Sequence, residues 1–324
     1  MKVGAKQNNG ISLKIVDDVQ LNNRKGAVVK ILGCGLCGSD IIKIDNPNYK
    51  NDVILGHEIV GKIEEINSDT NFKVGDVIVS SHHVPCGNCV YCKSGHAPMC
   101  KHFKETNFVP GGFSEKIFLS EEHLLNVAGK KPENLSDIEA SFYEPLACCI
   151  RAVRRANLKS GDKILVIGLG SIGILMAQAA KTFGADVLCC DILENRVKFT
   201  QKLGITAVNE VSQEKYFDII FVTAGADKTV QLAVDKVRDG GKIVVFASTP
   251  NNAPFLNNDI YYRELTVMGS YSPDLQDLKT SLELLKSRKV KVDGISTVYP
   301  FECINDAVSD TKNAKILKAY IKIS

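Results

Sequence analysis

Short apolar runs separated by Gly, Asn and Asp dominate the first part of the chain, up to about residue 140. Examples are Ala27-Val28-Val29-Lys30-Ile31 and Asp76-Val77-Ile78-Val79-Ser80. Runs of β-branched residues bounded by turn residues are typical of strands. Many short strands of this kind predict an antiparallel, barrel-like or sandwich-like β region.

The pattern changes at about residue 141, where apolar strands begin to alternate with helical segments. Strands are predicted at 163–167 and 187–190, followed by helices at about 171–183 and 194–203. Further strands fit 218–222, 242–246 and 265–268. Strands that are apolar throughout are typical of a parallel sheet covered on both faces. The predicted fold class is therefore α/β plus β, with a doubly wound parallel sheet.

The remaining segment suggests how the domains are arranged along the chain. Leu275, Leu278, Leu282 and Leu285 have helical spacing over 274–287, and a final strand fits 319–323. If this tail rejoins the first region, that domain is discontinuous. A chain of 324 residues suits two domains. We expect residues 1–143 and 274–324 to form one and residues 144–273 the other.

Composition and charge exclude several classes of protein. The net charge of +3, from 40 basic and 37 acidic residues, argues against a nucleic-acid or anionic-membrane partner. No segment approaches the ~18 apolar residues of a membrane span, and the first residues lack the apolar stretch of a signal peptide. We therefore expect a cytoplasmic protein. Because cytosolic thiols stay reduced, metal binding is the leading explanation for its 11 cysteines.

A dinucleotide site is predicted where the first strand of the α/β region meets its helix. Gly168-Leu-Gly170-Ser171-Ile172-Gly173 directly follows that strand. The first glycine allows the tight turn, the second lets the backbone approach a pyrophosphate, and the third lets helix pack on strand. The free N–H groups of Ser171, Ile172 and their neighbours at the helix N-terminus would then face the phosphates.

The end of the next strand bears on the choice of cofactor. Asp191 stands where an acidic side chain accepts hydrogen bonds from the adenosine ribose and repels a 2′-phosphate. Arg196 is the counter-argument, because an arginine nearby can hold that phosphate. Charge repulsion by Asp191 favours NAD over NADP.

Four cysteines have the sharpest spacing in the chain: Cys86-x2-Cys89-x2-Cys92-x7-Cys100. Four thiolates so close together suit a tetrahedral Zn²⁺ with no open position, which is a structural site. The seven-residue gap before Cys100 departs from the spacing of bacterial iron–sulfur ligands. A nucleic-acid zinc ribbon would need two separated C-x2-C pairs and a basic surface. Unliganded buried cysteines are the remaining alternative.

A second metal site is suggested by Cys37-Gly-Ser39-Asp40, by His57-Glu58 and by Glu144 at the junction of the two regions. Cys, His and carboxylates are plausible ligands for a zinc that keeps one position open. Such a site is expected in a cleft between domains, where an alcohol carbon can meet a nicotinamide. Taken singly, Cys37 is more typical of a small buried residue and Glu144 of a solvated one. Cys34-Gly-Leu-Cys37 could also be a redox pair, but no thioredoxin-like unit surrounds it.

These motifs together resemble the medium-chain, zinc-containing alcohol dehydrogenases over essentially the whole chain, and the sorbitol and polyol dehydrogenase branch most closely. The resemblance implies a GroES-like β-barrel catalytic domain, a Rossmann NAD-binding domain, one catalytic and one structural zinc, and a homodimer or homotetramer. The motifs that carry it are Cys34-Gly-Leu-Cys-Gly-Ser-Asp40, Leu55-Gly-His-Glu-Ile-Val-Gly61, Val74-Gly-Asp76, the four cysteines, Gly111-Gly-Phe113, Glu144-Pro-Leu-Ala147 and the Gly168 turn.

The resemblance also implies roles for single residues. Cys37 and His57 would bind the catalytic zinc. Glu58 would be a ligand or exchange with water, and Glu144 would be a ligand or act through the bound water. Ser39 would touch the substrate hydroxyl and relay its proton, while Asp40 would orient His57. Zinc would then polarise the alcohol oxygen so that a hydride passes from the alcohol carbon to the nicotinamide.

The chain departs from the family at two places that concern substrate and proton transfer. Ile42 stands where many relatives carry the outer histidine of the proton relay. Ser270-Tyr271-Ser272 lacks the arginine that sorbitol enzymes offer to the polyol, so sorbitol itself is not the expected substrate.

The expected activity is NAD-linked oxidation of a secondary alcohol or polyol. A phosphorylated sugar alcohol or an amino alcohol such as threonine is the alternative, with Lys101 and Lys104 as candidate phosphate ligands. A non-catalytic protein that keeps zinc and NAD is a third hypothesis.

Overall fold

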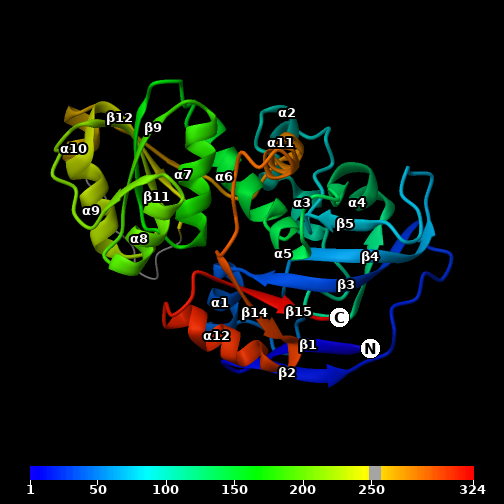
Figure 1. The fold of residues 1–324 in the computed structure, drawn as a ribbon. Helices are drawn as coiled ribbons and strands as arrows, with labels where there is room; N and C mark the ends of the chain where they lie inside the picture. The colour runs from blue at the N-terminus through cyan, green and yellow to red at the C-terminus, as the bar shows by residue number, and fades with distance from the viewer. Residues whose placement is uncertain (248–256) are drawn as a thin grey trace. The chain divides into compact units, whose positions relative to one another are not determined.

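The structure is a computed structural model that describes residues 1–247 and 257–324 (Figure 1). Contacts divide the chain into two compact units. The first comprises Met1–Glu144, Asp274–Lys286 and Val292–Ser324, and the second comprises Pro145–Pro273 and Ser287–Lys291. Two segments differ from the domains expected from the sequence. Glu144, expected in the second domain, lies in the first unit, and residues 287–291, expected in the first domain, lie in the second unit.

A sheet of seven strands forms the centre of the first unit. Its path runs β14-β15-β3-β4-β5-β7, and β6 also pairs with β3. All neighbours are antiparallel except β14 and β15, so the last strand returns to pair with β3 near the start of the chain. The strands are β3 (Gly26–Leu36), β4 (Glu58–Asn67), β5 (Val77–Ser80), β6 (Lys116–Ser120), β7 (Ala128–Lys130), β14 (Ser296–Pro300) and β15 (Lys318–Lys322), and a separate hairpin joins β1 (Lys2–Gln7) to β2 (Gly10–Ile15).

The central strand β3 is buried on both faces, which explains its run of small and β-branched residues. Val28, Val29 and Ile31 are fully buried, and Val28 and Val29 pair with both β4 and β6. The core of this unit gathers apolar side chains from strands far apart in sequence, among them Ile59, Ile78, Phe113, Ile117 and Ile321. Burial of this kind is the main favourable contribution to folding.

Short helices and turns connect these strands. They are α1 (Gly38–Asp45), α2 (Val90–Lys93), η1 (Ala97–Met99), α3 (Lys101–Glu105), α4 (Glu121–Asn126), α5 (Asp137–Ala140), α11 (Leu275–Lys286), η2 (Phe301–Cys303) and α12 (Ile304–Lys312). A longer helix, α6 (Tyr143–Arg155), begins in the first unit and continues into the second.

The second unit contains a six-stranded sheet in the order β10-β9-β8-β11-β12-β13, and every pair in it is parallel. Numbered within the unit, this order is 3-2-1-4-5-6, the doubly wound arrangement whose switch point lies beside the first strand. The strands are β8 (Lys163–Ile167), β9 (Asp186–Cys190), β10 (Thr206–Val208), β11 (Phe217–Val222), β12 (Val237–Val245) and β13 (Thr266–Gly269); the helices are α7 (Ser171–Thr182), α8 (Glu194–Lys202), α9 (Asp227–Lys236) and α10 (Asn257–Tyr262).

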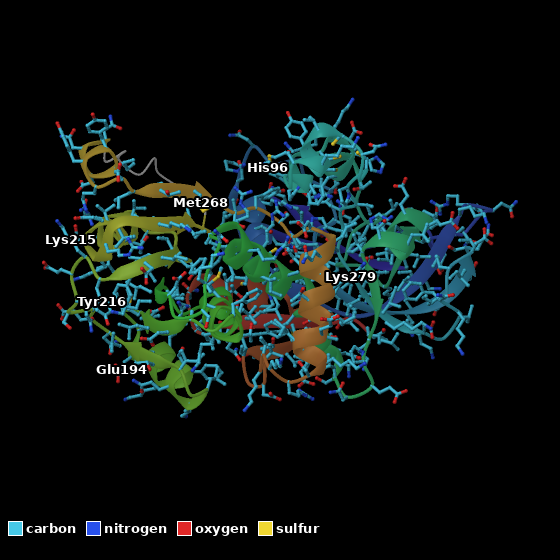
Figure 2. The ribbon with its side chains drawn as sticks, turned by 90° about the horizontal axis from the view of Figure 1, so that it is seen from above. His96, Glu194, Lys215, Tyr216, Met268 and Lys279 are labelled. Carbon is cyan, nitrogen blue, oxygen red and sulfur yellow. The ribbon has the colours of Figure 1, made fainter. Side chains whose placement is uncertain are left out.

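Helix α7 is buried along most of its length, because residues 173–180 are all buried. Its small side chains, Ala177, Ala179 and Ala180, allow it to lie close to the sheet. Polar side chains lie at the surface elsewhere: Figure 2 labels Glu194 at the start of α8 and Lys279 on α11. No helix in the described part of the chain is long and apolar enough to cross a membrane.

Candidate metal centres and dinucleotide site

The pairing of β3 with β4 brings the first set of candidate metal ligands together. Cys37 follows β3, and His57 and Glu58 stand at the start of β4, where Gly35 pairs with Glu58. One ligand atom from each of these three residues lies within 4.8 Å of the others. His57 and Glu58 are buried, with 7% and 1% of their surfaces exposed, and Cys37 is half-buried. The three candidate ligands are therefore largely shielded from solvent.

Asp40 links the two segments that carry these ligands. Its carboxylate accepts hydrogen bonds from the backbone N–H of Cys37 at 3.2 Å and of Gly56 at 3.4 Å. It also faces Nδ1 of His57 at 3.5 Å. Because Nδ1 is directed at Asp40, Nε2 is the nitrogen of His57 that remains to face a metal. Asp40 is fully buried, as the expected role of orienting His57 requires.

Charge couples Asp40 and His57. Burial opposes ionisation of Asp40. The charge of His57, together with the hydrogen bonds that Asp40 accepts from His57 and from the backbone of Cys37, nevertheless holds the pKa of the Asp40 carboxyl below its usual value. Burial also opposes a charge on His57, but Asp40 and Cys37 raise the pKa of the imidazole well above its usual value. A cation that binds here replaces the proton on His57, so its affinity depends on pH.

Glu58 is paired with Lys318, a residue to which the sequence drew no attention. The ammonium of Lys318 contacts the Glu58 carboxylate, and the two side chains are 4% and 1% exposed. Burial opposes the charge on Lys318, but Glu58 and Cys37 raise the pKa of the ammonium. Gly35 makes room for this pair: a Cβ at that position would lie 2.0 Å from Oε2 of Glu58.

Two more expected site residues lie near the group. Glu144 is buried near the start of α6, and its charge also raises the pKa of Lys318. Among the described residues, however, Glu144 is not part of the 4.8 Å group formed by Cys37, His57 and Glu58. Ser39 is exposed in the first turn of α1, between Cys37 and Asp40.

A histidine that sequence reasoning missed lies against His57. The ring centroids of His57 and His82 are 4.7 Å apart, with 43° between the ring planes. Burial, with the charge of His57, lowers the pKa of His82 well below its usual value. The available signal was the His82-His83 pair, which lies one residue after a buried strand and shortly before the first of the four cysteines.

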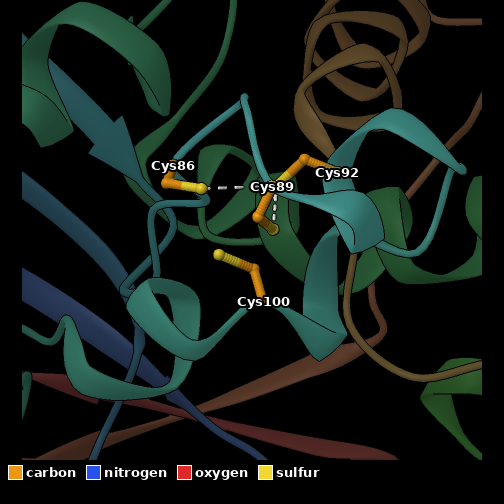
Figure 3. A group of neighbouring side chains, drawn as sticks. All are labelled: Cys86, Cys89, Cys92 and Cys100. Carbon is orange, nitrogen blue, oxygen red and sulfur yellow. Dashed lines mark hydrogen bonds between the residues drawn. The ribbon is translucent and has the colours of Figure 1, made fainter.

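The four cysteines form a second cluster, with one ligand atom from each within 4.8 Å of the others (Figure 3). The sulfur of Cys92 lies 3.6 Å from that of Cys89 and 4.0 Å from that of Cys86. These separations are far longer than the ~2.05 Å of a disulfide. They match the ~3.8 Å edge of a tetrahedron with metal–sulfur bonds of about 2.3 Å. Turns at Gly87 and Gly95, both with positive φ, wrap the loop around the sulfurs.

Both clusters fit zinc. Four thiols at tetrahedral separations would enclose the ion completely, which is the ligand set of a structural site. A thiol, an imidazole and a carboxylate would leave a position open, which is the ligand set of a catalytic site.

The glycines of the second unit lie where each one is needed. Gly168 has φ of +98°, a conformation that favours glycine. A Cβ on Gly173 would lie 1.8 Å from the carbonyl oxygen of Gly168, so only glycine lets α7 start so close to the turn after β8. A Cβ on Gly170 would meet nothing within 4 Å. The space beside Gly170 and the N–H groups of Ser171 and Ile172 is therefore available to a phosphate.

Asp191 directly follows β9 and is held beside this turn. One of its carboxylate oxygens accepts a hydrogen bond from the N–H of Leu169 at 2.6 Å, and the other accepts one from Leu193 at 2.9 Å. The guanidinium of Arg196 lies 3.6 Å from the same carboxylate. Because Arg196 faces Asp191, its charge is partly neutralised within the protein.

Comparison with known proteins agrees with this geometry. Residues 23–129 match the family described as alcohol dehydrogenase GroES-like domain, and residues 171–287 match zinc-binding dehydrogenase. D-xylulose reductase A of Aspergillus oryzae is 30% identical over 328 residues, which cover 93% of this chain and 90% of that protein. Sorbitol dehydrogenase of Bacillus subtilis is 31% identical over 268 residues, covering 74% of this chain and 75% of that protein.

Among solved structures, an Escherichia coli oxidoreductase of unknown specificity superposes with a TM-score of 0.88, 26% identity and full coverage of both chains. The chain therefore belongs to the zinc-containing medium-chain alcohol dehydrogenases and is similar to their polyol dehydrogenase-like branch. The family, the fold class and the zinc and nicotinamide cofactors predicted from the sequence are confirmed.

Proposed function

We propose that this protein oxidises a secondary alcohol or polyol with NAD and catalyses the reverse reduction. The observation that carries the proposal is the group of Cys37, His57 and Glu58, whose ligand atoms lie within 4.8 Å of one another in a chain that also carries the glycine turn. We assign Cys37, His57 and Glu58 as ligands of a catalytic zinc. Glu144, whose charge raises the pKa of Lys318, is assigned as the ligand that exchanges with water.

When bound, zinc supplies a Lewis acid that favours loss of the alcohol proton near neutral pH. The chain's own residues position the reaction. Asp40 holds His57 in one tautomer and fixes the Cys37 backbone against the start of β4. Lys318 balances the negative charge of Glu58. Ser39 is assigned to accept the proton of the substrate hydroxyl and pass it to solvent, since it is exposed and Ile42, which is 55% exposed, cannot relay a proton.

NAD is the proposed cofactor. Asp191 accepts hydrogen bonds from the backbone N–H of Leu169 in the glycine turn and from that of Leu193, and at this place its charge would repel the 2′-phosphate of NADP. Arg196 would otherwise attract that phosphate, but it faces Asp191 at 3.6 Å. The four-cysteine cluster is assigned to a structural zinc, which gives two zinc ions per chain.

A phosphorylated substrate is supported less well. The side chain of Lys101 is 88% exposed and pairs with Glu105 at 3.7 Å, and Lys104 is also exposed. Neither lysine has the burial expected of a residue that holds a phosphate in a pocket.

We also propose that the protein self-associates in a reducing compartment, the cytoplasm. All 11 cysteines are free thiols in the structure, as expected where disulfides do not form.

In the described part of the sheet, β13 is an edge strand that pairs only with β12, and Val267 on it is 44% exposed. Such an edge can pair with a second copy, which size-exclusion chromatography with light scattering would detect as a dimer or tetramer.

One experiment tests the proposed activity. The purified protein is analysed for zinc per chain and assayed with NAD and NADP against polyols, simple secondary alcohols, polyol phosphates and amino alcohols. Two zinc ions and NAD reduction with polyols or secondary alcohols would support the proposal. Activity only with a phosphate ester or an amino alcohol would replace the substrate class, and NAD binding without turnover would show a non-catalytic protein.

A further inference from the structure

A hollow of about 380 Å³ lies in the second unit, at the end of α7 opposite the glycine turn. Its lining comes from the last two turns of α7, from Leu203 and Ile205 before β10, and from Lys289 and Lys291. Because α7 has 12 residues and a helix rises 1.5 Å per residue, its two ends lie about 17 Å apart. The hollow is therefore separate from the dinucleotide site.

The charge of this hollow is entirely positive. Lys181, Lys289 and Lys291 line it and are all exposed, and none of the described residues that line it is acidic. Within the described part of the chain, none of the three lysines forms an ion pair; the ammonium of Lys181 donates to the carbonyl of Gly204 at 3.0 Å. Like charges that are held close together repel one another, and a bound anion relieves that repulsion.

A buried glutamine holds two of these lysines in place. The side-chain amide of Gln178, which is 8% exposed, donates to the carbonyl of Lys291 at 2.8 Å and accepts from the N–H of the same residue at 2.8 Å. Val290 and Val292 are buried, whereas Lys289 and Lys291 are exposed and line the same hollow. The backbone that carries the two lysines is thus fixed before any ligand binds, which lowers the entropy lost on binding.

The competing explanation is that the lysines offset the negative end of the α7 dipole. The last carbonyls of α7, those of Ala179, Ala180 and Lys181, already accept hydrogen bonds from backbone N–H groups of residues 183–185. Lys181 stands in the last turn and suits that role. Lys289 and Lys291 come from a different segment, so the dipole accounts for one of the three charges and leaves two without an explanation.

We propose that this hollow binds phosphate, either free or as the phosphate group of a small metabolite. Lysine ammonium groups bind phosphate oxygens through charge-assisted hydrogen bonds. A phosphate held by Lys181, Lys289 and Lys291 would join α7 to residues 287–291, the segment at which the chain leaves the first unit and then returns to it. The site shares no residue with the glycine turn or with either metal cluster, and it does not depend on the proposed oxidation.

The test titrates inorganic phosphate and glucose 6-phosphate into the zinc-loaded protein by calorimetry, with excess NAD present to keep both probes out of the glycine turn. Replacing Lys289 and Lys291 together by Gln should weaken binding about tenfold, because two charged contacts are lost. Replacing both by Arg keeps the charge and should preserve binding. The matched control replaces Lys215 and Lys228 by Gln, which removes the same charge from exposed positions of the same unit outside the hollow.

Each outcome decides for or against the site. Tighter binding of glucose 6-phosphate would identify a phosphate ester as the ligand, and tighter binding of free phosphate would identify the inorganic ion. The melting temperature of the wild type should rise with phosphate concentration, and that of the double Gln variant should rise less. Unchanged affinity in the double Gln variant, an equal loss in the Lys215 and Lys228 control, or no binding of either probe by the wild type would overturn the proposal. The comparison of variants holds whether or not the protein oxidises an alcohol.

Discussion

Lys318 and Glu58 form an ion pair from which solvent is almost completely excluded, and Glu58 is itself one of the candidate metal ligands. Removal of one partner of a buried pair leaves an uncompensated charge in the interior. We therefore expect Lys318→Met to lower the free energy of unfolding by about 3 kcal/mol, measured by denaturant titration. Lys322→Met, at an exposed position on the same strand, is the control. Equal stability of the two variants would show that the pair contributes nothing.

Asp40 should govern how tightly the catalytic site holds zinc. Asp40→Asn keeps the size of the side chain but removes the charge that faces His57 and is hydrogen-bonded to the Cys37 and Gly56 backbones. We expect zinc affinity at this site to fall about 10- to 100-fold, measured by competition with a chromogenic chelator. Asp45→Asn is the control, because Asp45 ends the same helix and pairs with Lys312. Unchanged affinity in Asp40→Asn would argue against a positioning role.

The four-cysteine cluster should hold a zinc of its own. We expect Cys100→Ser to lower the zinc content from two ions per chain to one, because a buried ligand is lost. The melting temperature should fall by roughly 5 °C or more, since metal binding contributes to folding. Cys303→Ser, outside both clusters, should change neither value. Retention of both ions in Cys100→Ser would refute the assignment.

Cofactor choice should depend on Asp191. Asp191→Ser removes the charge that opposes a 2′-phosphate and frees Arg196 to bind it. We expect the ratio of kcat/KM for NAD to that for NADP to fall at least about tenfold. Asp186→Asn, at the exposed start of the same strand, should leave the ratio unchanged. A preference for NADP in the wild type would contradict the proposal at once.

Acid should destabilise the first unit through its buried histidines. Burial lowers the pKa of His83 to about 4 and also lowers that of His123. Between pH 4 and pH 6.5 the unfolded chain therefore binds more protons than the folded one, so stability rises with pH across this window and is lost as the pH falls. Unfolding free energies at pH 5 and pH 7 measure the slope.

Substitution of one of these histidines should make the slope shallower. In His83→Phe the ring that contacts Phe103 is kept but one titrating group is removed. A similar change at His102, whose imidazole is exposed and pairs with Glu122, serves as the comparison. A slope that stays the same in His83→Phe would exclude this residue as a source of the acid sensitivity.

Sequence reasoning succeeded where the chemistry is local. The cluster of Cys86, Cys89, Cys92 and Cys100 lies within one short loop, and the turn from Gly168 to Gly173 is set by backbone conformation and close packing. Both depend on residues a few positions apart, so spacing alone predicted them. The alternation of strands and helices likewise predicted the parallel sheet, because burial on both faces requires apolar strands.

The contacts that sequence reasoning missed are those made between strands. His82 meets His57 because of the register of β4 and β5, and Lys318 meets Glu58 because β15 returns to β3. A lysine in a strand is usually solvated, and nothing near Lys318 in the sequence marks it as buried. The family resemblance supplied Glu144 as a ligand, but the spacing of residues could not place it relative to Cys37 and His57.

The pairing of β15 with β3 has a consequence for the order in which the protein matures on the ribosome. Synthesis delivers Cys37, His57 and Glu58 early and Lys318 much later, when the strand that carries it emerges and joins the sheet. Until then the lysine that pairs with Glu58 is missing, and the end of β3 that pairs with β15 has a free edge. A nascent chain stalled before β15 should therefore bind zinc differently from the released protein, and loading of the catalytic ion should follow translation.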